Sequence, residues 1–299
     1  MNANKVSVII PSYNSQETLK YSLEGLSKQI REVDFEVIVV DCSSHNEVER
    51  LCTKYGFVNF HHEKKRFSPG IGRNIGASLA QGDLLVFIDS DVILEENALT
   101  RIRKHYNDGY KIFGGALELS DFSPGSVASQ LEHSFYNHEN QKNRPVKKRK
   151  NLSSAFLVVE KKLFDDAGGF KDIPRMQDTE LTERIGSSGV EIYFFPDIVA
   201  YQIQDSKLSK VFRKIYIGGV NLPAIRYADR GFMKTVFFFF FLPLIALAKT
   251  GRIILRNLRY CTHPLRELAI SPMILVSGFV WMTGFYKGII FNKGISKNR

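Results

Sequence analysis

The sequence predicts an α/β fold, in which a mostly parallel sheet with helices on both faces precedes a membrane-associated helical region. Three observations lead to this prediction. Short apolar runs alternate with segments of helical periodicity over the first 200 residues, as in parallel sheets. Polar and acidic residues directly follow several of these runs. Two long uncharged segments occur after residue 230.

Local patterns predict the individual elements. Strands are expected at seven apolar runs, which are residues 6–10, 35–40, 57–60, 84–88, 110–113, 156–159 and 190–195. Leucines at helical spacing between residues 19 and 26 predict a first helix. Ser44 and Glu47 have the spacing of a capping box and predict the start of a second. Ser68 and Pro69 predict the start of a third, which runs to about residue 80.

Composition limits the class of protein. The chain has 299 residues, 44% of them hydrophobic, which is enough for a sizeable core. Its net charge of +10 favours an anionic partner, either a nucleotide, an anionic lipid or a nucleic acid. The basic residues lie beside apolar segments and do not alternate with aromatic residues, so no nucleic-acid role is expected. Three cysteines without metal-type spacing favour a reduced, cytosolic setting.

Polar residues at three strand ends predict a ligand site. Asp89 and Asp91 follow the run at 84–88, and period-2 alternation predicts that their carboxylates point to one side. Such hard oxygen ligands suit Mg²⁺ or Mn²⁺. Pro11 and Tyr13 follow the first run, and Asp41 follows the second. Because ligands of parallel sheets bind outside the carboxyl ends of the strands, these residues are expected to line one crevice.

The last third of the chain predicts a separate region. We expect one domain over residues 1–205 and a membrane-associated helical region over 206–299. Residues 207–217 have the pattern of a basic amphipathic helix. Residues 235–248 and 268–286 carry no charge and predict hydrophobic helices.

The topology of these hydrophobic helices stays open. Lys and Arg flank both segments on every side, so the positive-inside rule selects no orientation. A monotopic or re-entrant hairpin on the cytosolic leaflet is preferred over a hairpin that spans the membrane twice. A buried soluble hairpin is the third alternative. No signal peptide is recognised, so residues 1–230 are expected in the cytosol.

Five segments in order resemble the family 2 glycosyltransferases, which have a GT-A fold. They are VSVIIPSYNSQETL, EVIVVDCSS, SPGIGRNIGASLAQGDLLVFIDSDV, AGGF and QDTEL. The resemblance covers roughly residues 5–200. It implies a nucleotide-sugar donor and transfer of a sugar to an acceptor.

The resemblance implies roles for the residues at the strand ends. Pro11, Tyr13 and Asp41 match positions that hold the nucleotide base, where a ring can stack and a carboxylate can accept an N–H. Arg73 matches a residue beside the donor diphosphate. Asp89 matches a position that contacts the ribose or, indirectly, the metal. The structural alternatives are local packing for Tyr13, a helix cap for Asp41 and a surface ion pair for Arg73.

The same resemblance assigns the metal ligand and the base. Asp91 matches the direct ligand of Mn²⁺ or Mg²⁺, and Asp178 matches the catalytic base of an inverting transfer. Gln177 departs from the family, in which glutamate is common, and a lower pKa of Asp178 is expected if that acid normally tunes the base. Glu180 is an alternative base, and helix capping is the structural alternative for Asp178.

The acceptor side is less specific. Ser153 and Ser154 are polar candidates there, and Phe156 stands where many relatives carry asparagine. The basic segment at 142–150 is expected to be a loop, either solvated or closing over a diphosphate. The Gln-x-x-Arg-Trp motif of processive members is not found after Asp178, which predicts transfer of one sugar per encounter.

These inferences predict an inverting, metal-dependent glycosyltransferase at the cytosolic membrane face. The expected donor is a UDP-sugar, and one sugar would be transferred to a lipid-linked (polyprenyl) or surface-polysaccharide acceptor. The alternatives are a catalytically silent nucleotide-sugar-binding membrane protein and a sugar-nucleotidyltransferase. The latter usually has a glycine-rich basic loop after its first strand, where this chain has PSYN.

Overall fold

The computed structural model describes residues 5–29, 33–173, 176–204, 207–227 and 231–291. The chain forms two compact units. The first, called here the sheet unit, comprises Met1–Ser120 and Arg144–Ile203, and the second, the helical unit, comprises Asp121–Asn143 and Gln204–Arg299. The division expected at residue 205 lies outside the described residues. The grouping of residues 121–143 with the C-terminal helices was not expected.

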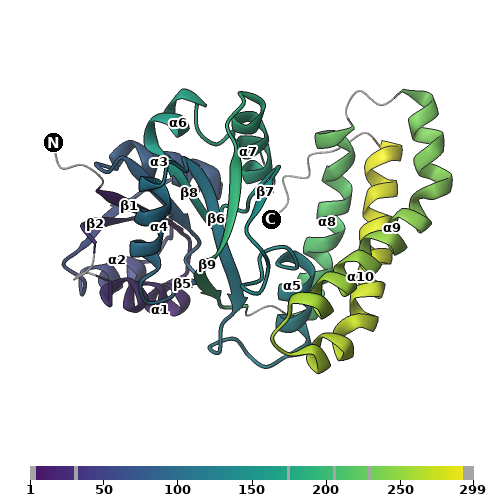
Figure 1. Ribbon diagram of the computed structural model, residues 1–299, viewed down its shortest axis with the longest axis horizontal. Coiled ribbons are helices and arrows are strands. Elements are labelled where there is room, and N and C mark those ends of the chain that lie inside the picture. The colour runs from purple at the N-terminus through teal and green to yellow at the C-terminus, as the bar shows by residue number, and fades with distance from the viewer. Residues whose placement is uncertain (1–4, 30–32, 174–175, 205–206, 228–230, 292–299) are drawn as a thin grey trace. The chain divides into compact units, whose positions relative to one another are not determined.

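Among its described residues, the sheet unit contains nine strands, which Figure 1 shows as arrows. They are β1 (Val6–Ser12), β2 (Phe35–Asp41), β3 (Val58–His62), β4 (Leu84–Ile88), β5 (Val92–Leu94), β6 (Ile112–Leu119), β7 (Lys147–Arg149), β8 (Phe156–Glu160) and β9 (Ile192–Gln202). Each of the seven predicted runs overlaps a strand. Two strands were not predicted, β5 and β7, and β7 corrects the expectation of a basic loop throughout 142–150.

The sheet order is β3-β2-β1-β4-β8-β6-β9-β5, with β7 paired to β9. The strands β3, β2, β1 and β4 are parallel, as predicted. In the other half β6 and β9 are parallel, but β8, β5 and β7 pair antiparallel. The parallel half is therefore the part in which neighbouring strands end at one edge.

Helices cover both faces of the sheet (Figure 1). They are α1 (Gln16–Ser27), α2 (Glu47–Cys52), α3 (Pro69–Leu79), α4 (Ala98–Asn107), α6 (Lys161–Asp166) and α7 (Gln177–Ser187). Alternate residues of β1, β2, β4 and β8 enter two separate cores. Val8 packs with residues of α1 and α4, whereas Ile9 packs with residues of α3 and α7. Burial on both faces explains why these strands are continuous apolar runs.

Two predicted helix starts differ in outcome. The helix α3 begins at Pro69 with Ser68 at the N-cap, as predicted. The helix α2 begins at Glu47 after Asn46, so the predicted capping box with Ser44 at the cap is wrong. Ser44 lies too far before the first helical N–H groups to cap them.

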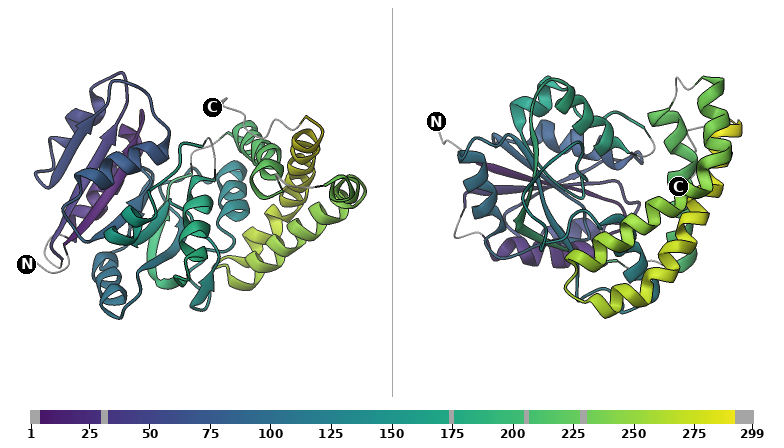
Figure 2. Two further views of the ribbon diagram at one scale, coloured as in Figure 1. Left: turned by 90° about the horizontal axis from the view of Figure 1, so that it is seen from above. Right: turned by 45° about the vertical axis from the view of Figure 1, so that its right-hand side comes forward.

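The helical unit consists of α5 (Val127–Tyr136), α8 (Leu208–Arg226), α9 (Phe232–Tyr260) and α10 (Pro264–Phe291). Figure 2 shows α8, α9 and α10 side by side. The helix α8 begins as the predicted amphipathic helix but continues beyond residue 217. By length and composition, Thr235–Tyr260 and Pro264–Phe291 could each cross a membrane. Both helices extend beyond the uncharged segments from which they were predicted.

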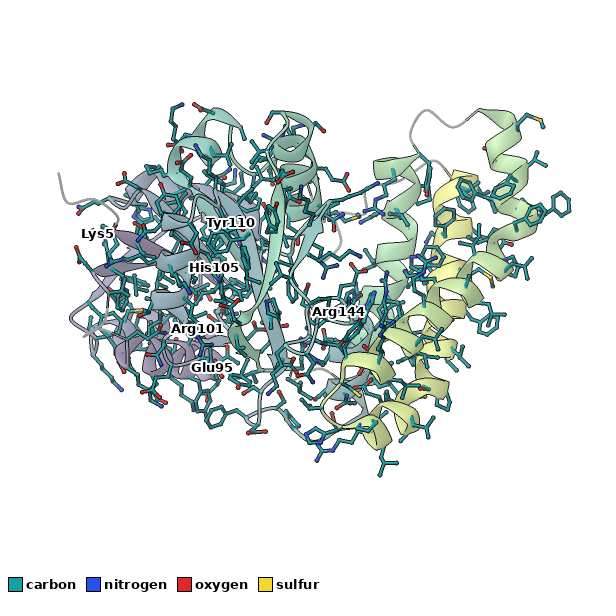
Figure 3. All side chains as sticks on the ribbon, viewed as in Figure 1. Lys5, Glu95, Arg101, His105, Tyr110 and Arg144 are labelled. Atoms are coloured by element: carbon teal, nitrogen blue, oxygen red, sulfur yellow. The ribbon has the colours of Figure 1, made fainter. Side chains whose placement is uncertain are left out.

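The helical unit has its own core and a large exposed apolar surface. Trp281 and Phe285 of α10 pack with Val211 and Ile215 of α8. A Cβ at Gly284 would lie 2.2 Å from the Tyr216 oxygen, so glycine is required for this close approach of α8 and α10. Aromatic rings project from α9 (Figure 3). The exposed apolar side chains of α9 include Phe237, Phe239, Phe240, Phe241, Leu244 and Leu247.

Candidate active site

The ends of β1, β2 and β4 meet at one edge of the sheet. Ser12 is the register partner of Asp41, and Ile9 is the partner of Phe87 one residue before the end of β4. The N–H of Cys42 also donates to the Ser12 oxygen at 3.2 Å, which continues the pairing beyond β2. The predicted convergence of polar strand ends is therefore observed.

Asp41 joins the two loops that follow β1 and β2. It is 1% exposed, and its two carboxylate oxygens accept hydrogen bonds from the Ser43 N–H at 2.9 Å and the Ser43 hydroxyl at 2.8 Å. The Ser43 Oγ in turn accepts from the Asn14 N–H at 2.7 Å. Asp41 is not a helix cap, because α2 begins at Glu47. Sequence reasoning missed Ser43, whose signal is its position two residues after a strand-end aspartate.

Tyr13 presents an accessible ring beside this loop pair. It is 44% exposed, and the guanidinium of Arg66 lies 4.3 Å from its ring centroid. Pro11 is buried within β1, so it contributes backbone shape and not an open surface. Arg66 was also missed, although it ends a basic run just before Ser68. An aromatic face and a guanidinium are both suited to stacking on a nucleotide base.

Arg73 is buried beneath Asp89. It lies on α3, is 3% exposed and forms an ion pair with the Asp89 carboxylate. Its guanidinium also lies 5.6 Å from the Phe170 ring, and its Nε has no hydrogen-bond partner in the described part of the chain. Asp89 is the more exposed member of the pair. Arg73 is thus well placed to orient Asp89, and its contact with a diphosphate stays a prediction.

Asp91 lies in a turn between β4 and β5. The Val92 N–H donates to the Asp89 oxygen at 3.0 Å, so residues 89–91 are not extended and the predicted strand alternation is wrong there. The Asp91 carboxylate accepts from the Gln202 side chain at 3.2 Å, and its main-chain oxygen accepts from Ile203 at 2.8 Å. The end of β9 therefore fixes this turn.

The donor set fits a hard divalent cation only in combination with a ligand. Among the described residues, no group of three or more His, Cys, Asp or Glu side chains could hold a metal. Asp91 and Asp89 offer carboxylate oxygens, which Mg²⁺ and Mn²⁺ prefer. One or two carboxylates are sufficient where nucleotide phosphates supply further ligands.

Asp178 lies close to the Arg73–Asp89 pair. It is the second residue of α7, and its oxygens accept from the Thr179 N–H at 2.7 Å and the Ser154 N–H at 3.2 Å. Burial raises the pKa of Asp178, and the negative charge of Asp89 raises it further. The two hydrogen bonds and the positive charge of Arg73 act in the opposite direction, but the net effect is a raised pKa. A carboxylate with a raised pKa is a stronger base.

Glu180, the alternative base, is held by two cations. The Arg184 side chain donates to both of its carboxylate oxygens, at 3.0 and 2.8 Å, and Lys171 lies 2.6 Å away. Burial alone would raise the pKa of Glu180, but the hydrogen bonds from Arg184 and Lys171 outweigh it and lower the pKa. Glu180 is therefore a poorer base than Asp178.

Gln177 has a structural role beside the proposed base. Its Nε2 donates to the Ile173 main-chain oxygen at 2.7 Å and to the Ser68 hydroxyl at 3.1 Å. A glutamate here would offer no N–H to the Ile173 oxygen at neutral pH. The departure from the family motif thus links the start of α7 to the start of α3.

The acceptor-side candidates are placed by their backbone contacts. Ser154 is buried, and its N–H donates to Asp178, whereas the Ser153 hydroxyl accepts from the Ala155 N–H at 3.2 Å. Both serines lie just before β8, and acceptor contacts by their side chains stay a prediction. Part of the basic segment is fixed, because β7 pairs antiparallel with β9 and Lys148 forms an ion pair with Glu191, just before β9.

Comparison with known proteins identifies the family. Residues 7–168, more than half of the chain, match the profile of glycosyl transferase family 2. Glycosyltransferase AglE of Haloferax volcanii is 26% identical over 201 residues, which are 65% of this chain and 65% of AglE. The poly(ribitol-phosphate) beta-N-acetylglucosaminyltransferase TarP of Staphylococcus aureus is 34% identical over 110 residues, 35% of this chain and 33% of TarP. The chain thus spans less than two thirds of AglE and about a third of TarP.

Solved structures agree in fold. S. aureus TarS 1–349 in complex with UDP-GlcNAc has a TM-score of 0.55 at 16% identity, covering 98% of this chain and 93% of that chain. Mannosyltransferase PcManGT from Pyrobaculum calidifontis, in complex with GDP-Man and Mn²⁺, has a TM-score of 0.60 at 16% identity, covering 98% and 88%. The chain belongs to glycosyl transferase family 2 and has a GT-A fold.

Proposed function

We propose that this family 2 member is an inverting, metal-dependent, non-processive glycosyltransferase. It transfers one sugar from a nucleotide sugar, in our proposal a UDP-sugar, to a lipid-linked or surface-polysaccharide acceptor at the cytosolic membrane face. The observation that carries the proposal is the placement of Asp178. This carboxylate has a raised pKa and lies within electrostatic reach of Arg73 and Asp89.

The donor would bind at the converging strand ends. In this proposal the base stacks on Tyr13 and the Asp41 carboxylate accepts a ring N–H, with Pro11 shaping the backbone between them. Two features support this arrangement: the open ring of Tyr13 and the rigid link from Asp41 through Ser43 to the Tyr13 loop. TarS and PcManGT, which share the fold, were solved with UDP-GlcNAc and GDP-Man respectively.

Asp178 would act as the general base. Its ionised carboxylate accepts the proton of an acceptor hydroxyl, while the oxygen of that hydroxyl bonds to the anomeric carbon of the donor. The bond from this carbon to the diphosphate breaks, and its electron pair leaves with the nucleoside diphosphate. Attack from the face opposite the leaving group inverts the anomeric configuration.

Asp91, with Asp89 beside it, would hold Mn²⁺ or Mg²⁺ together with the donor diphosphate. Such a cation would neutralise the negative charge that the diphosphate gains as it departs. The solved structure of PcManGT with GDP-Man and Mn²⁺ supports a divalent cation in this fold. Arg73 would keep the Asp89 carboxylate in place through the ion pair.

The acceptor is inferred from the helical unit. Exposed apolar side chains on α9 and the basic face of α8 (Lys207, Lys210 and Arg213) suit an anionic membrane surface. An enzyme held at a membrane meets lipid-linked acceptors at high local concentration. This supports a polyprenyl-linked or surface-polysaccharide acceptor.

The test measures binding and turnover separately. Detergent-purified full-length protein is given UDP- and GDP-sugars with Mn²⁺ and a polyprenyl-phosphate-linked lipid extract. Donor binding is followed by calorimetry, and turnover is followed by nucleotide release. Asp178→Asn should bind the donor normally but turn over roughly 10²–10⁴-fold more slowly.

Two further variants complete the design. Asp91→Asn should lose the metal-dependent part of donor binding, whereas Asp108→Asn, an exposed aspartate after α4, should change neither quantity. Donor binding by the wild type without turnover on any acceptor would favour a silent nucleotide-sugar-binding protein. Absence of donor binding would show that the strand-end site is assigned wrongly.

A further inference from the structure

Lys249 lies at a transition in the helix α9. The segment at 235–248 before it is uncharged, and Arg252, Arg256 and Arg259 follow it. Its Nζ lies 4.1 Å from the centroid of the Trp281 ring on α10 and 5.2 Å from that of the Phe135 ring on α5. Two neighbouring helices of the helical unit thus present aromatic faces to one ammonium group of α9.

The Lys249 ammonium keeps N–H groups available for a ligand. Lys249 forms no ion pair with any carboxylate among the residues that the structure describes. The acidic side chains of α5, of the residues just after it and of α10 have other partners: Glu132 binds Lys214, Glu139 binds Arg256, and Glu267 binds Gln130 and Ser134. A cation–π contact engages the charge but leaves N–H groups of the ammonium available for an acceptor.

The surroundings favour an anion. Arg226, at the end of α8, lies close enough for its positive charge to act on Lys249. The positive charges of Lys249 and Arg226 both attract an anion that approaches Lys249. Lys249 is only partly buried, so such an anion could reach it.

The position of Lys249 along α9 indicates which anion. The exposed Phe237, Phe240, Phe241, Leu244 and Leu247 precede it on the same helix and would contact hydrocarbon. The basic half of α9 follows it. In a bilayer, the layer between hydrocarbon and water is occupied by lipid phosphates, and tryptophan side chains such as Trp281 are enriched there.

We propose that Lys249 and the ring of Trp281 form a binding site for the phosphate group of a membrane lipid. The ammonium binds phosphate oxygens, and the acyl chains lie along the exposed aromatic surface of α9. The proposal takes the association with a membrane from the proposed function but does not depend on glycosyl transfer.

Trp281 provides the readout, because it is the only tryptophan of the chain. Full-length protein in detergent is titrated with short-chain phosphatidylglycerol, and Trp281 emission is recorded. Native mass spectrometry of the same samples counts bound lipids. A saturable change in emission with one lipid bound is expected, and inorganic phosphate should produce it only at far higher concentration.

Variants separate this site from general charge attraction. Lys249→Met should weaken phosphatidylglycerol binding roughly tenfold or more, since a charge-assisted hydrogen bond is lost. Lys249→Arg should keep it. Arg252→Met, which removes an exposed cation from the same helix, should bind like the wild type.

The outcomes are distinct. Equal lipid binding by Lys249→Met and the wild type would overturn the proposal. Inorganic phosphate binding as tightly as the lipid would overturn the lipid assignment and leave a site for soluble phosphate. Failure of the wild type to sediment with phosphatidylglycerol vesicles would contradict the membrane association in the proposed function, while the titration with soluble short-chain lipid would still test the site.

Discussion

The hydroxyl of Tyr286 on α10 donates a hydrogen bond of 2.8 Å to the main-chain oxygen of Phe239 on α9. Four residues later in α9 stands Pro243, which has no N–H to donate to that oxygen. The side chain of one helix thus supplies the hydrogen bond that the sequence of the other removes. This contact helps α9 to continue as a helix across Pro243.

Replacing Tyr286 by Phe should therefore lower the free energy of unfolding by about 1 kcal/mol, the usual net value of one hydrogen bond. Denaturant unfolding in detergent, followed by circular dichroism, measures the loss. In a Pro243→Ala background the helix regains its own N–H donor. Tyr286→Phe should then cost less, and an equal cost in both backgrounds would contradict this role.

The pKa of Asp178 should set the acid limb of catalysis. The base works only when ionised, so kcat/KM should fall as the pH drops through this pKa. Because burial raises the pKa, the limb should lie above that of an ordinary aspartate, whose pKa is about 3.9. The charge of Asp89 raises the pKa further and that of Arg73 lowers it.

Charge variants should move this limb in opposite directions. Asp89→Asn should shift it to lower pH, and Arg73→Gln should shift it to higher pH, whatever their effects on the maximal rate. Glu180→Gln should leave its position unchanged, because no effect of Glu180 on the pKa of Asp178 is found. An acid limb at the same pH in the wild type and all three variants would exclude Asp178 as the titrating base. The measurement is a pH–rate profile for each.

Adjacent glycines offer a matched test of the turn that supports Arg73. Gly168 and Gly169 both have positive φ, 76° and 66°. A Cβ at Gly168 meets nothing within 4 Å, whereas one at Gly169 would lie 2.7 Å from the Asn74 Oδ1. Asn74 binds Phe170 through two hydrogen bonds, of 2.8 and 2.9 Å, and Phe170 lies beside Arg73.

Gly168→Ala should cost roughly 1–2 kcal/mol of stability, from backbone strain alone. Gly169→Ala should cost clearly more, because it also displaces Asn74, and it should weaken donor binding through Arg73. Denaturation midpoints and donor calorimetry of the two variants check this. Equal losses of stability in both would mean that the Asn74 contact contributes little.

Much of the fold could be predicted because its elements have strong local signals. The run at 84–88 coincides with β4, since a fully apolar segment bounded by Asp83 and Asp89 leaves little ambiguity. Strands β5 and β7 have three residues each, too few to show a period. The lengths of α9 and α10 were underestimated, because a helix that buries only one face tolerates charged residues on its other faces.

The types and positions of the site residues could be predicted from the sequence, but the contacts between them could not. The strand-end positions of Asp41, Asp89 and Asp91 follow from the order of apolar runs. The ion pair of Arg73 with Asp89 and the grouping of residues 121–143 with the C-terminal helices depend on long-range packing. No periodicity in the sequence encodes such contacts.

That helical grouping leads to a last prediction, on acid stability. His133 is buried in α5, where burial lowers its pKa to about 4, from an ordinary value of 6.5. As the pH falls below about 6.5, the unfolded chain binds a proton at this position before the folded chain does. Stability is therefore fully present above pH 6.5 and is lost as the pH falls towards 4. The slope for one such histidine is about 1.4 kcal/mol per pH unit.

His133→Gln should remove this slope, because glutamine keeps a neutral polar side chain that does not titrate in this range. Denaturant unfolding of the helical unit between pH 7.5 and 5 measures it. His138, whose pKa burial also lowers to about 4, should contribute a second slope that remains in the variant. His45→Gln, at an exposed position of the sheet unit, is the matched control and should behave like the wild type. A pH dependence unchanged by His133→Gln would show that protonation of this histidine does not limit the stability of the helical unit in acid.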